Sequence, residues 1–539
     1  MTEPRYHYGI IPNPERFPRL WSDWLRPATV LLVAVLLVTG ITTAGPWLIG
    51  RLSCRDGLPS GDVYSSDGEC VGITDGSYAF GLPAEFEQVL GRIAAQNKAT
   101  ENLPCGPGRK PVEIGVLTTL THPNSGARAL HKLEGFAAGQ ARSNQPGCSR
   151  PLVLQVGHTG KAEQEVEELA RRFREDPNIV AVVGFPLSSI PAARAANVLG
   201  APLDENEGNP VPMVSDTITA EGFDRDGTQD TAGCDEEALF SQGIGHGYFF
   251  RVSYRIDVQV RELANYLGAG NRPTMIVTPI ESSDPYTCIT LNRLKTLYQE
   301  QQPEVPEVAF SPDDESTVRE MAKRVCREQG VVTAFYIARS RDLGKFLAYL
   351  AERYDTGFCT ATITVVSTSD AARMRVPESD SNLEPPRSKA LQSKAFADGR
   401  LRLIYTPLAD PDALRRSEGG GGSEFMQLMQ LFDGAGVDQA HLDDGWAINA
   451  YDAVYTVAEA IEGLSVNRPL TRALVRGEIA GFTATGEQTQ LVGANGRIGF
   501  ENSGNRAGTP VTVRLCPLDP EGRTNTVTQP GPPGDRTPC

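Results

Sequence analysis

Side-chain hydroxyls follow two apolar segments at the points where strands of a sheet would end. Ser188 and Ser189 follow the run NIVAVVGF, and an alanine-rich helical segment begins directly after them. Thr217 and Thr219 follow the shorter run VPMVS. The free N–H groups and positive dipole end of such a helix bind an anion without a lysine. These residues therefore favour a site for a small anionic group, although a serine here also suits a plain helix N-cap.

Motifs of the common enzyme classes are absent from the sequence. It has no G-x-x-x-x-G-K-[ST] loop, no G-x-S-x-G elbow, no H-E-x-x-H helix and no Rossmann glycine fingerprint after a strand. Six histidines and the lack of any C-x-x-C pair give no zinc-like spacing. We therefore expect a binding protein that is not an enzyme and needs no cofactor or metal. An extracellular hydrolase is kept as a minor alternative.

Alternating strand and helix patterns surround these hydroxyls. The run VEIGVLTTLT reads as a strand, and Leu130, Leu133 and Phe136 have helical spacing after it. The alternation continues through VPMVS and starts again with PTMIVTPI. This order predicts two α/β units with parallel sheets covered by helices.

An uncharged segment at residues 27–50 predicts a membrane anchor. As a helix it would measure about 36 Å, enough for a hydrocarbon core of about 30 Å. Arginines dominate the charges before it, which places the N-terminus in the cytoplasm and the rest of the chain outside. A cleaved signal peptide is the competing interpretation.

The charge and cysteine content fit an exported protein. Acidic residues outnumber basic ones by 67 to 51 without a basic run, which argues against a nucleic-acid partner. All ten cysteines follow the apolar segment, so disulfides are expected. Many connectivities are possible, and pairing between sequence neighbours is the one we predict: Cys54–Cys70, Cys105–Cys148, Cys234–Cys288, Cys326–Cys359 and Cys516–Cys539.

Seven segments between residues 111 and 517 resemble, in order, the type 1 periplasmic binding proteins. The nearest branch is similar to the leucine/isoleucine/valine-binding proteins and the ligand-binding regions of related receptors. The segments are VEIGVLTTLT with SGARALHKLEGFAAG, NIVAVVGFPLSSIPAARAANVLG, VPMVSDTIT, YFFRVSYRIDVQVRELANYL, DPYTC, AYDAVYTVAEAI and GRIGFENSGNR.

The resemblance implies two Rossmann-like lobes that close on a small ligand at a hinge. In the first lobe it assigns the ligand carboxylate to Ser188, Ser189 and the helix that follows them. It assigns a backbone carbonyl to Thr217 and a hydroxyl to Thr219.

In the second lobe the resemblance implies three further ligand contacts. These are Tyr286, the loop at Ser340, and Asp370 as the carboxylate for an ammonium group. Two residues depart from the pattern. Asp216 stands where relatives carry proline or a small residue, and Arg339 stands where amino-acid binders carry glycine or an aromatic residue.

Together these features predict a membrane-anchored extracytoplasmic solute-binding protein for an amino-acid-like ligand, in uptake or sensing, with an ABC permease or a membrane sensor as partner. A ligand-free scaffold that acts as an interaction module of a sensor complex is the alternative. The expected parts are a cytoplasmic tail (1–26), a transmembrane helix (27–50), a stalk or cap (51–110), a binding domain (111–517) and a disordered tail (518–539). The first lobe is expected at about 111–251 plus 400–490, and the second at 252–399 plus 491–517.

Overall fold

A computed structural model describes the greater part of the chain after residue 61. The described residues are 54, 62–103, 105, 110–202, 209–268, 272–280, 284–298, 304–312, 314–417, 420–465, 469–485, 489–528, 531–535 and 539. The predicted cytoplasmic tail and transmembrane helix, residues 1–26 and 27–50, lie outside them. Within the described ranges, no helix has the length and apolar character needed to cross a membrane.

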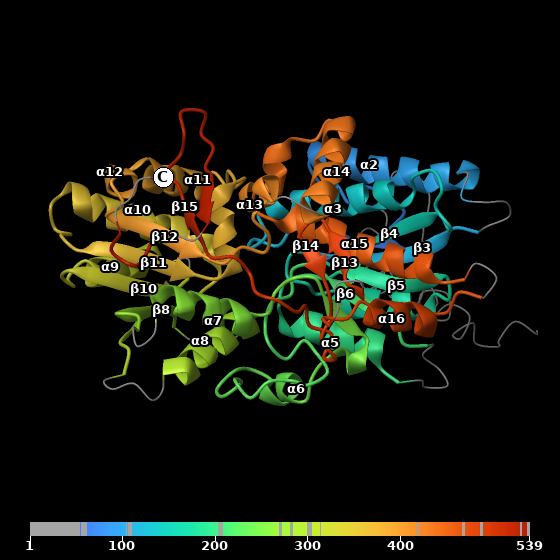
Figure 1. Ribbon diagram of the computed structural model, residues 1–539, viewed down its shortest axis with the longest axis horizontal. Coiled ribbons are helices and arrows are strands. Elements are labelled where there is room, and N and C mark those ends of the chain that lie inside the picture. The colour runs from blue at the N-terminus through green and yellow to red at the C-terminus, as the bar shows by residue number, and fades with distance from the viewer. Residues whose placement is uncertain are drawn as a thin grey trace, which may run out of the picture.

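Two seven-stranded sheets form two lobes (Figure 1). In the first sheet the strands from β4 to β7 are parallel, and the edge strands β1 and β2 are antiparallel. Its order is β1 (Val63–Ser66), β2 (Glu69–Thr74), β4 (Leu152–His158), β3 (Val112–Thr118), β5 (Ile179–Gly184), β6 (Met213–Ser215) and β7 (Phe249–Arg251).

The second sheet has the same plan, with its antiparallel strands at one edge. Its order is β16 (Thr526–Thr528), β15 (Val513–Leu515), β12 (Leu401–Tyr405), β11 (Thr362–Ser367), β10 (Val331–Tyr336), β8 (Met275–Pro279) and β9 (Glu307–Phe310). The continuous apolar runs of β5 and β11 are buried along their whole length, as parallel strands covered on both faces require.

Helices cover both faces of the first sheet. One face packs in a single apolar core with α2 (Ala84–Ala99), α3 (Arg128–Ser143), α14 (Gly420–Ala435), α15 (Trp446–Gly463) and α16 (Arg472–Gly481). The other face packs with α4 (Val166–Glu175) and α5 (Ile190–Gly200). A two-stranded hairpin, β13 (Leu491–Gly493) and β14 (Gly496–Ile498), completes this lobe.

Close packing of α3 against α15 fixes the position of α3. A Cβ atom at Gly135 would lie 2.2 Å from the Ala447 carbonyl oxygen, and one at Gly139 would lie 2.8 Å from Val454 Cβ. Only glycine permits this approach. It seats the N-terminal half of α3 deep in the lobe, so that even Arg128 and Lys132 are buried.

The second sheet is covered in the same way. Its core on one face includes α9 (Glu315–Val325), α10 (Leu343–Asp355), α11 (Glu384–Gln392) and α12 (Lys394–Ala397). The other face packs with α7 (Ile256–Leu267) and α8 (Pro285–Tyr298), in a core that continues into the α4–α5 face of the first lobe. The short elements are α6 (Glu237–Ser241), α13 (Pro411–Arg416), η1 (Thr100–Asn102), η2 (Gly245–Gly247), η3 (Ser340–Asp342), η4 (Ser369–Arg375) and η5 (Gln439–Leu442).

The described chain passes between the lobes after β7, after β12 and after β14. The predicted class, a two-lobed α/β fold, is therefore confirmed. The predicted lobe boundary at residue 400 is wrong for β12, which pairs with β11 in the second sheet. The boundary at 491 is wrong for the β13–β14 hairpin, whose apolar residues join the core of the first lobe.

Two further predictions need correction. Residues 62–103 are not a separate stalk, because β2 pairs with β4 and α2 buries Leu90 and Ile93 in the first core. The tail after residue 517 is not disordered throughout, because β16 pairs with β15. All five predicted disulfides are confirmed.

Candidate ligand-binding site

The predicted ligand-binding residues lie at the carboxyl ends of the strands, where the two lobes face each other. Arg339 of the second lobe donates from Nη2 to the Ser188 carbonyl oxygen of the first lobe at 2.9 Å. Arg128 of the first lobe donates from Nη1 to Asp370 Oδ1 of the second at 2.9 Å. The fold therefore brings predicted residues of both lobes to one buried contact between the lobes.

Both predicted serines already have partners within the first lobe. Ser188 Oγ accepts hydrogen bonds from the backbone N–H groups of Thr219, at 3.1 Å, and Ala220, at 3.2 Å. Ser189 is the N-cap of α5 and accepts from Ala192 N at 3.1 Å. These contacts agree with the N-cap interpretation, and both hydroxyls are engaged in hydrogen bonds within the first lobe.

A buried carboxylate, Glu163, lies where the ligand carboxylate was expected. It accepts hydrogen bonds from the Ser189 hydroxyl and, at 3.1 Å, from Leu187 N. Burial raises the pKa of Glu163, and these two hydrogen bonds oppose the shift. Glu163 was not predicted from the sequence, because a glutamate in a polar loop normally faces solvent.

A buried ammonium group, that of Lys132 on α3, lies beside the predicted threonine. Its Nζ is 3.1 Å from Asp216 Oδ1, donates to Thr217 Oγ1 at 3.2 Å, and also donates to the Phe185 carbonyl. Burial lowers the pKa of Lys132, whereas Asp216 opposes that shift. The unusual Asp216 is thus the partner of an internal cation. The Thr219 carbonyl accepts from Ile256 N at 2.8 Å.

On the second lobe the guanidinium of Arg339 fills the space over a predicted ligand residue. Its Cζ lies 4.2 Å from the centre of the Tyr286 ring, and its Nη2 is 2.8 Å from Asp284 Oδ1. Burial raises the pKa of Tyr286, whose hydroxyl contacts Thr368 Oγ1. Arg339, the second residue that departs from the family pattern, is therefore also a cation paired within the protein.

Asp370 has the environment of an ionised carboxylate. Burial alone would raise its pKa, but Arg128 and Arg339 outweigh burial and lower it. The backbone N–H of Ser340 donates to Asp370 Oδ2 at 2.7 Å, whereas Ser340 Oγ is buried without a hydrogen-bond partner among the described residues. Asp370 is thus ready to hold a cation, and in this closed arrangement that cation is Arg128.

A groove of about 670 Å³ opens between the lobes beside these ion pairs. Its walls combine apolar side chains with imidazole rings, and the rings of His131 and His441 stack at 4.2 Å. His131 Nδ1 is 2.6 Å from Asp444, and His441 Nδ1 is 2.8 Å from Glu134. The apolar residues at the groove include Leu82, Phe86, Leu120, Leu130 and Val376.

No metal site accompanies this groove. Across the part of the chain that the structure covers, no three histidine, cysteine, aspartate or glutamate residues form a cluster suited to a metal ion.

Comparison with known proteins supports the fold. No protein-family model and no curated protein matches the sequence. A substrate-binding protein of an ABC transporter from Desulfitobacterium hafniense, solved with Leu, is 17% identical with a TM-score of 0.51, over 78% of this chain and 100% of that one. A leucine-binding protein from Thermotoga maritima is 18% identical with a TM-score of 0.52, over 77% and 97%.

A third solved structure has a different kind of ligand. The solute-binding protein of an ABC transporter from Rhodopseudomonas palustris BisB5, in complex with 3,4-dihydroxybenzoic acid, is 12% identical with a TM-score of 0.52, over 79% of this chain and 98% of that one. At such identities the likeness establishes the fold: the chain has the two-lobed fold of the type 1 periplasmic binding proteins.

Proposed function

We propose that this protein is an extracytoplasmic solute-binding protein, held at the membrane by residues 27–50, that captures a small ligand between its lobes for uptake or sensing. The observation that carries the proposal is the interlobe groove of a fold shared with solute-binding proteins. An ABC permease or a membrane sensor is the partner such a role requires.

The ligand we favour binds in the groove, beside the predicted amino-acid pocket. A free amino acid at Ser189 and Thr217 would have to displace Glu163 and Lys132, which carry the same two charges. Displacement would break the buried hydrogen bonds that Ser189 and Thr217 make with these groups, at a cost of several kcal/mol. A ligand with an apolar body and one polar group, set among Leu130, Phe86 and the imidazole rings, needs no such displacement.

A second candidate function is favoured by the same internal charges. Glu163 and Lys132 hold the first lobe in the arrangement that a bound amino acid would impose, and Arg128 and Arg339 bridge to the other lobe. A closed two-lobed scaffold that needs no ligand would serve as an interaction module of a membrane complex.

A thermal-shift screen of the full chain in detergent separates the two candidates. A ligand that binds the folded state at 100 times its Kd adds about 2.7 kcal/mol of stability and raises Tm. Leu130→Arg, which fills the groove, should abolish that rise, and Glu320→Gln on α9, which does not line the groove, serves as the control. If amino acids, aromatic acids and other small metabolites all leave Tm unchanged, the scaffold function is favoured.

The orientation in the membrane needs its own test. A cysteine placed at Ser22 should be shielded from a membrane-impermeant thiol reagent in intact cells, while the chain after Arg51 should be open to added protease. Labelling of that cysteine together with protection of the lobes would reverse the proposed topology.

A further inference from the structure

A long connection between β6 and β7 leaves the first sheet and returns to it. Its residues 224–247, here called the strap, contain α6 and η2 and pack on the first lobe. Phe240 lies 5.7 Å from Phe223 between ring centres, and Gly245 N donates to Asn197 Oδ1 of α5 at 2.8 Å. Asp224 Oδ2 lies 3.3 Å from Arg251 Nη2. The strap is therefore a fixed part of the first lobe.

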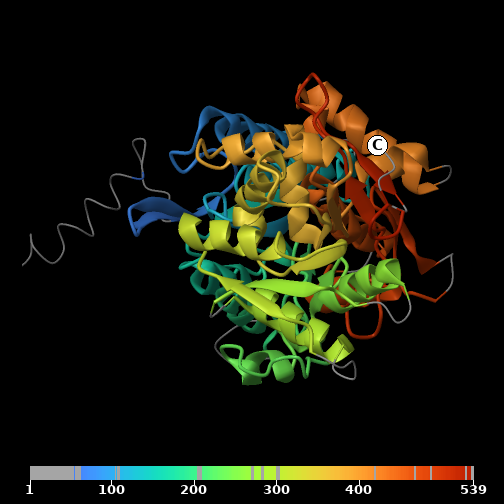
Figure 2. The same cartoon turned by 90° about the vertical axis from the view of Figure 1, so that its left-hand side faces the viewer.

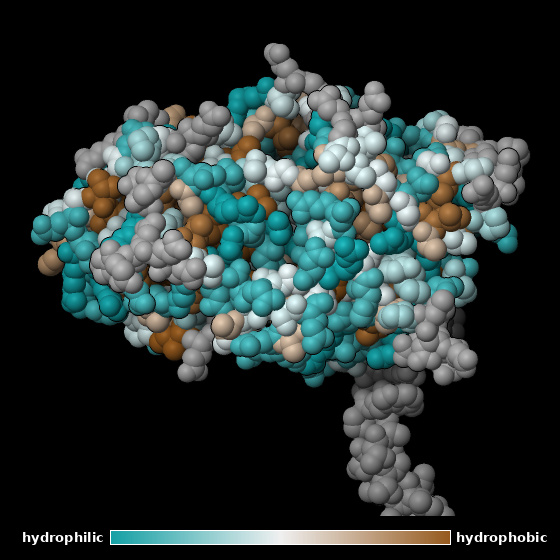
Figure 3. All heavy atoms as spheres, turned by 60° about the horizontal axis from the view of Figure 1, so that its bottom comes forward, coloured by the Kyte–Doolittle hydropathy of each residue, from teal (hydrophilic) through white to brown (hydrophobic). Residues whose placement is uncertain are grey.

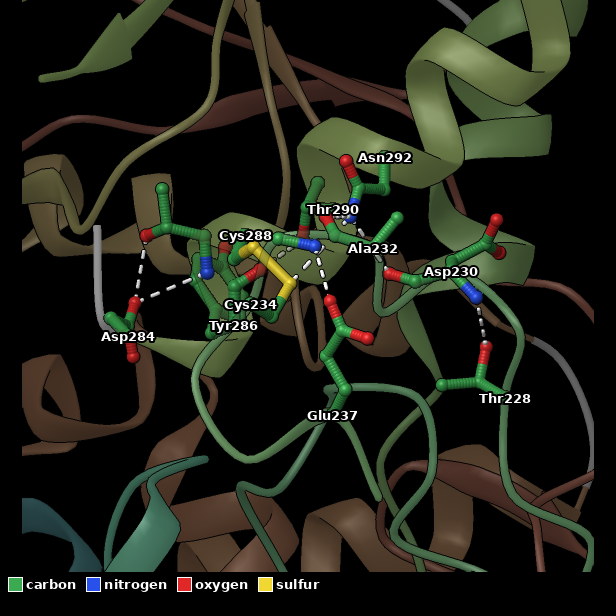
Figure 4. The surroundings of a disulfide bond; sticks show 12 residues. Thr228, Asp230, Ala232, Cys234, Glu237, Asp284, Tyr286, Cys288, Thr290 and Asn292 are labelled. Atoms are coloured by element: carbon green, nitrogen blue, oxygen red, sulfur yellow. Dashed lines mark hydrogen bonds between the residues drawn. A yellow bond between two sulfur atoms is a disulfide. The ribbon is translucent and has the colours of Figure 1, made fainter. Parts of the chain in front are cut away.

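The tip of the strap is bonded to the second lobe. Cys234 forms a disulfide with Cys288 on α8, with Cα atoms 5.8 Å apart (Figure 4). From the same helix, Asn292 Nδ2 donates to the carbonyl oxygens of Ala232, at 2.8 Å, and Asp230, at 3.1 Å. Thr296 Oγ1 donates to Asp230 Oδ1 at 3.2 Å. A covalent bond and three hydrogen bonds thus cross from one lobe to the other.

The helix that receives the strap also forms a wall of the cleft. Tyr286, which lies under Arg339, stands two residues before Cys288, and Asp284 pairs with Arg339 just before the helix begins. In Figures 1 and 2, α6 of the strap lies at the bottom of the molecule and α2, whose N-terminal end borders the groove, lies at the top. Strap and groove therefore occupy opposite edges of the cleft.

We propose that the strap and its disulfide form a clasp that keeps the lobes joined at this edge, so that the cleft opens only at the groove edge. Two-lobed proteins open by rotation about a hinge, and this rotation normally separates the lobes everywhere except at the hinge. The Cα atoms of a disulfide separate by no more than about 7 Å, so Cys288 and the start of α8 cannot move away from the strap. The face that carries α6 is mostly hydrophilic (Figure 3), whereas Cys234 itself is buried.

The clasp does not depend on the identity of a ligand. It depends only on the attachment of the strap to both lobes. It would limit opening in a solute-binding protein, and it would equally stabilise the closed state of a scaffold. A ligand would then enter and leave past the imidazole rings at the groove, because the strap edge stays closed.

Tryptophan fluorescence provides the test. Trp446 is 3% exposed and lies beside the bridge between the lobes, with Arg128 Cζ 4.5 Å from its ring. Replacing Trp21, Trp24 and Trp47 by phenylalanine leaves Trp446 as the single tryptophan of the full chain. In this background, Cys234→Ser with Cys288→Ser should raise the acrylamide quenching constant of Trp446 about threefold or more, since the lobes can then part at both edges.

A second disulfide supplies the matched control. Cys326→Ser with Cys359→Ser removes a bond that lies within the second lobe alone, and it should leave the quenching constant unchanged. Because serine at the buried Cys234 can itself disturb folding, the pair Cys234→Ala with Cys288→Ala is measured in parallel, and circular dichroism verifies folding. Equal quenching in the folded clasp variants and the parent overturns the proposal, and so does an equal rise in the control.

Discussion

Lys132 and Asp216 form an ion pair within the first lobe, with 3.1 Å between Nζ and Oδ1 and both side chains out of contact with solvent. Glu163 lies nearby and is held by the Ser189 hydroxyl. The protein thus provides its own carboxylate, Glu163, where the ligand carboxylate was expected, and its own cation, Arg128, at Asp370, where the ligand ammonium was expected. The effects of these internal charges on stability and on closure of the lobes can be measured.

Removing the cation alone should be costly. Lys132→Met leaves Asp216 buried without a partner, which should lower the free energy of unfolding by about 3–5 kcal/mol. Adding Asp216→Asn should recover most of that loss, because no unpaired charge then remains. Urea denaturation of the full chain measures both variants. A single variant within about 1 kcal/mol of the parent would contradict a charged pair.

The bridge between the lobes should control closure. Asp370→Asn removes the charge that holds Arg128, a contact worth about 1.5–3 kcal/mol, so the fraction of open molecules should rise about tenfold or more. Acrylamide quenching of Trp446 follows this change. Glu320→Gln, an exposed carboxylate of α9 that pairs with Lys323, is the control and should have no effect. Unchanged quenching in Asp370→Asn would show that the lobes close by other contacts.

The two serines should act on stability even when no ligand is present. Ser188→Ala leaves two buried N–H groups without an acceptor and should cost about 1–3 kcal/mol. Ser189→Ala removes an N-cap and should cost about 1 kcal/mol. Thermal unfolding of the ligand-free protein tests both. Serines that serve only a ligand would leave Tm unaltered.

A buried histidine should make stability depend on pH. His158 Nδ1 accepts from Leu120 N, its Nε2 is buried without a partner in the described part of the chain, and burial lowers its pKa to about 4. The unfolded chain takes up this proton below about pH 6.5, whereas the folded chain resists until about pH 4. Stability should therefore fall as pH drops through this window, by about 3 kcal/mol from this residue.

His158→Asn isolates that contribution. The variant should lose less stability between pH 6.5 and pH 4 than the parent, and the exposed His246→Asn should behave like the parent. Urea denaturation at several pH values gives the comparison. Parallel curves for His158→Asn and the parent would rule out the assigned role.

Much of the fold could be predicted because the spacing of apolar residues and the order of strands and helices can be recognised in a single sequence. The apolar runs at β3, β5 and β11 and the helices between them identified two parallel sheets. The disulfides were predicted correctly because successive cysteines along the chain bond in pairs, as Cys54 does with Cys70 and Cys234 with Cys288. The β1–β2 edge escaped prediction, since its short, half-exposed strands lack a clear alternation of apolar and polar residues. The place of β12 depended on strand pairing that the local pattern does not encode.

The candidate site was predicted less well than the fold. The predicted residues lie where the two lobes meet, but their partners within the protein were not foreseen. Lys132 stands on an otherwise ordinary helix, where a lysine normally faces water. The available signal was the pair Gly135 and Gly139 on the same helix, which indicated a close neighbour and therefore a buried face. Asp216 and Arg339, noted as departures, proved to be charges engaged within the protein.

The late position of α15 in the chain has a consequence for biogenesis. His131 of α3 pairs with Asp444, just ahead of α15, across 313 residues of sequence. As the chain emerges from the ribosome, the strands of the first sheet are made long before the helix that covers Ile114, Val116 and Phe136. This apolar face stays uncovered by α15 until the second sheet, up to β12, has been synthesised. A nascent chain of this design therefore needs chaperone protection during that interval.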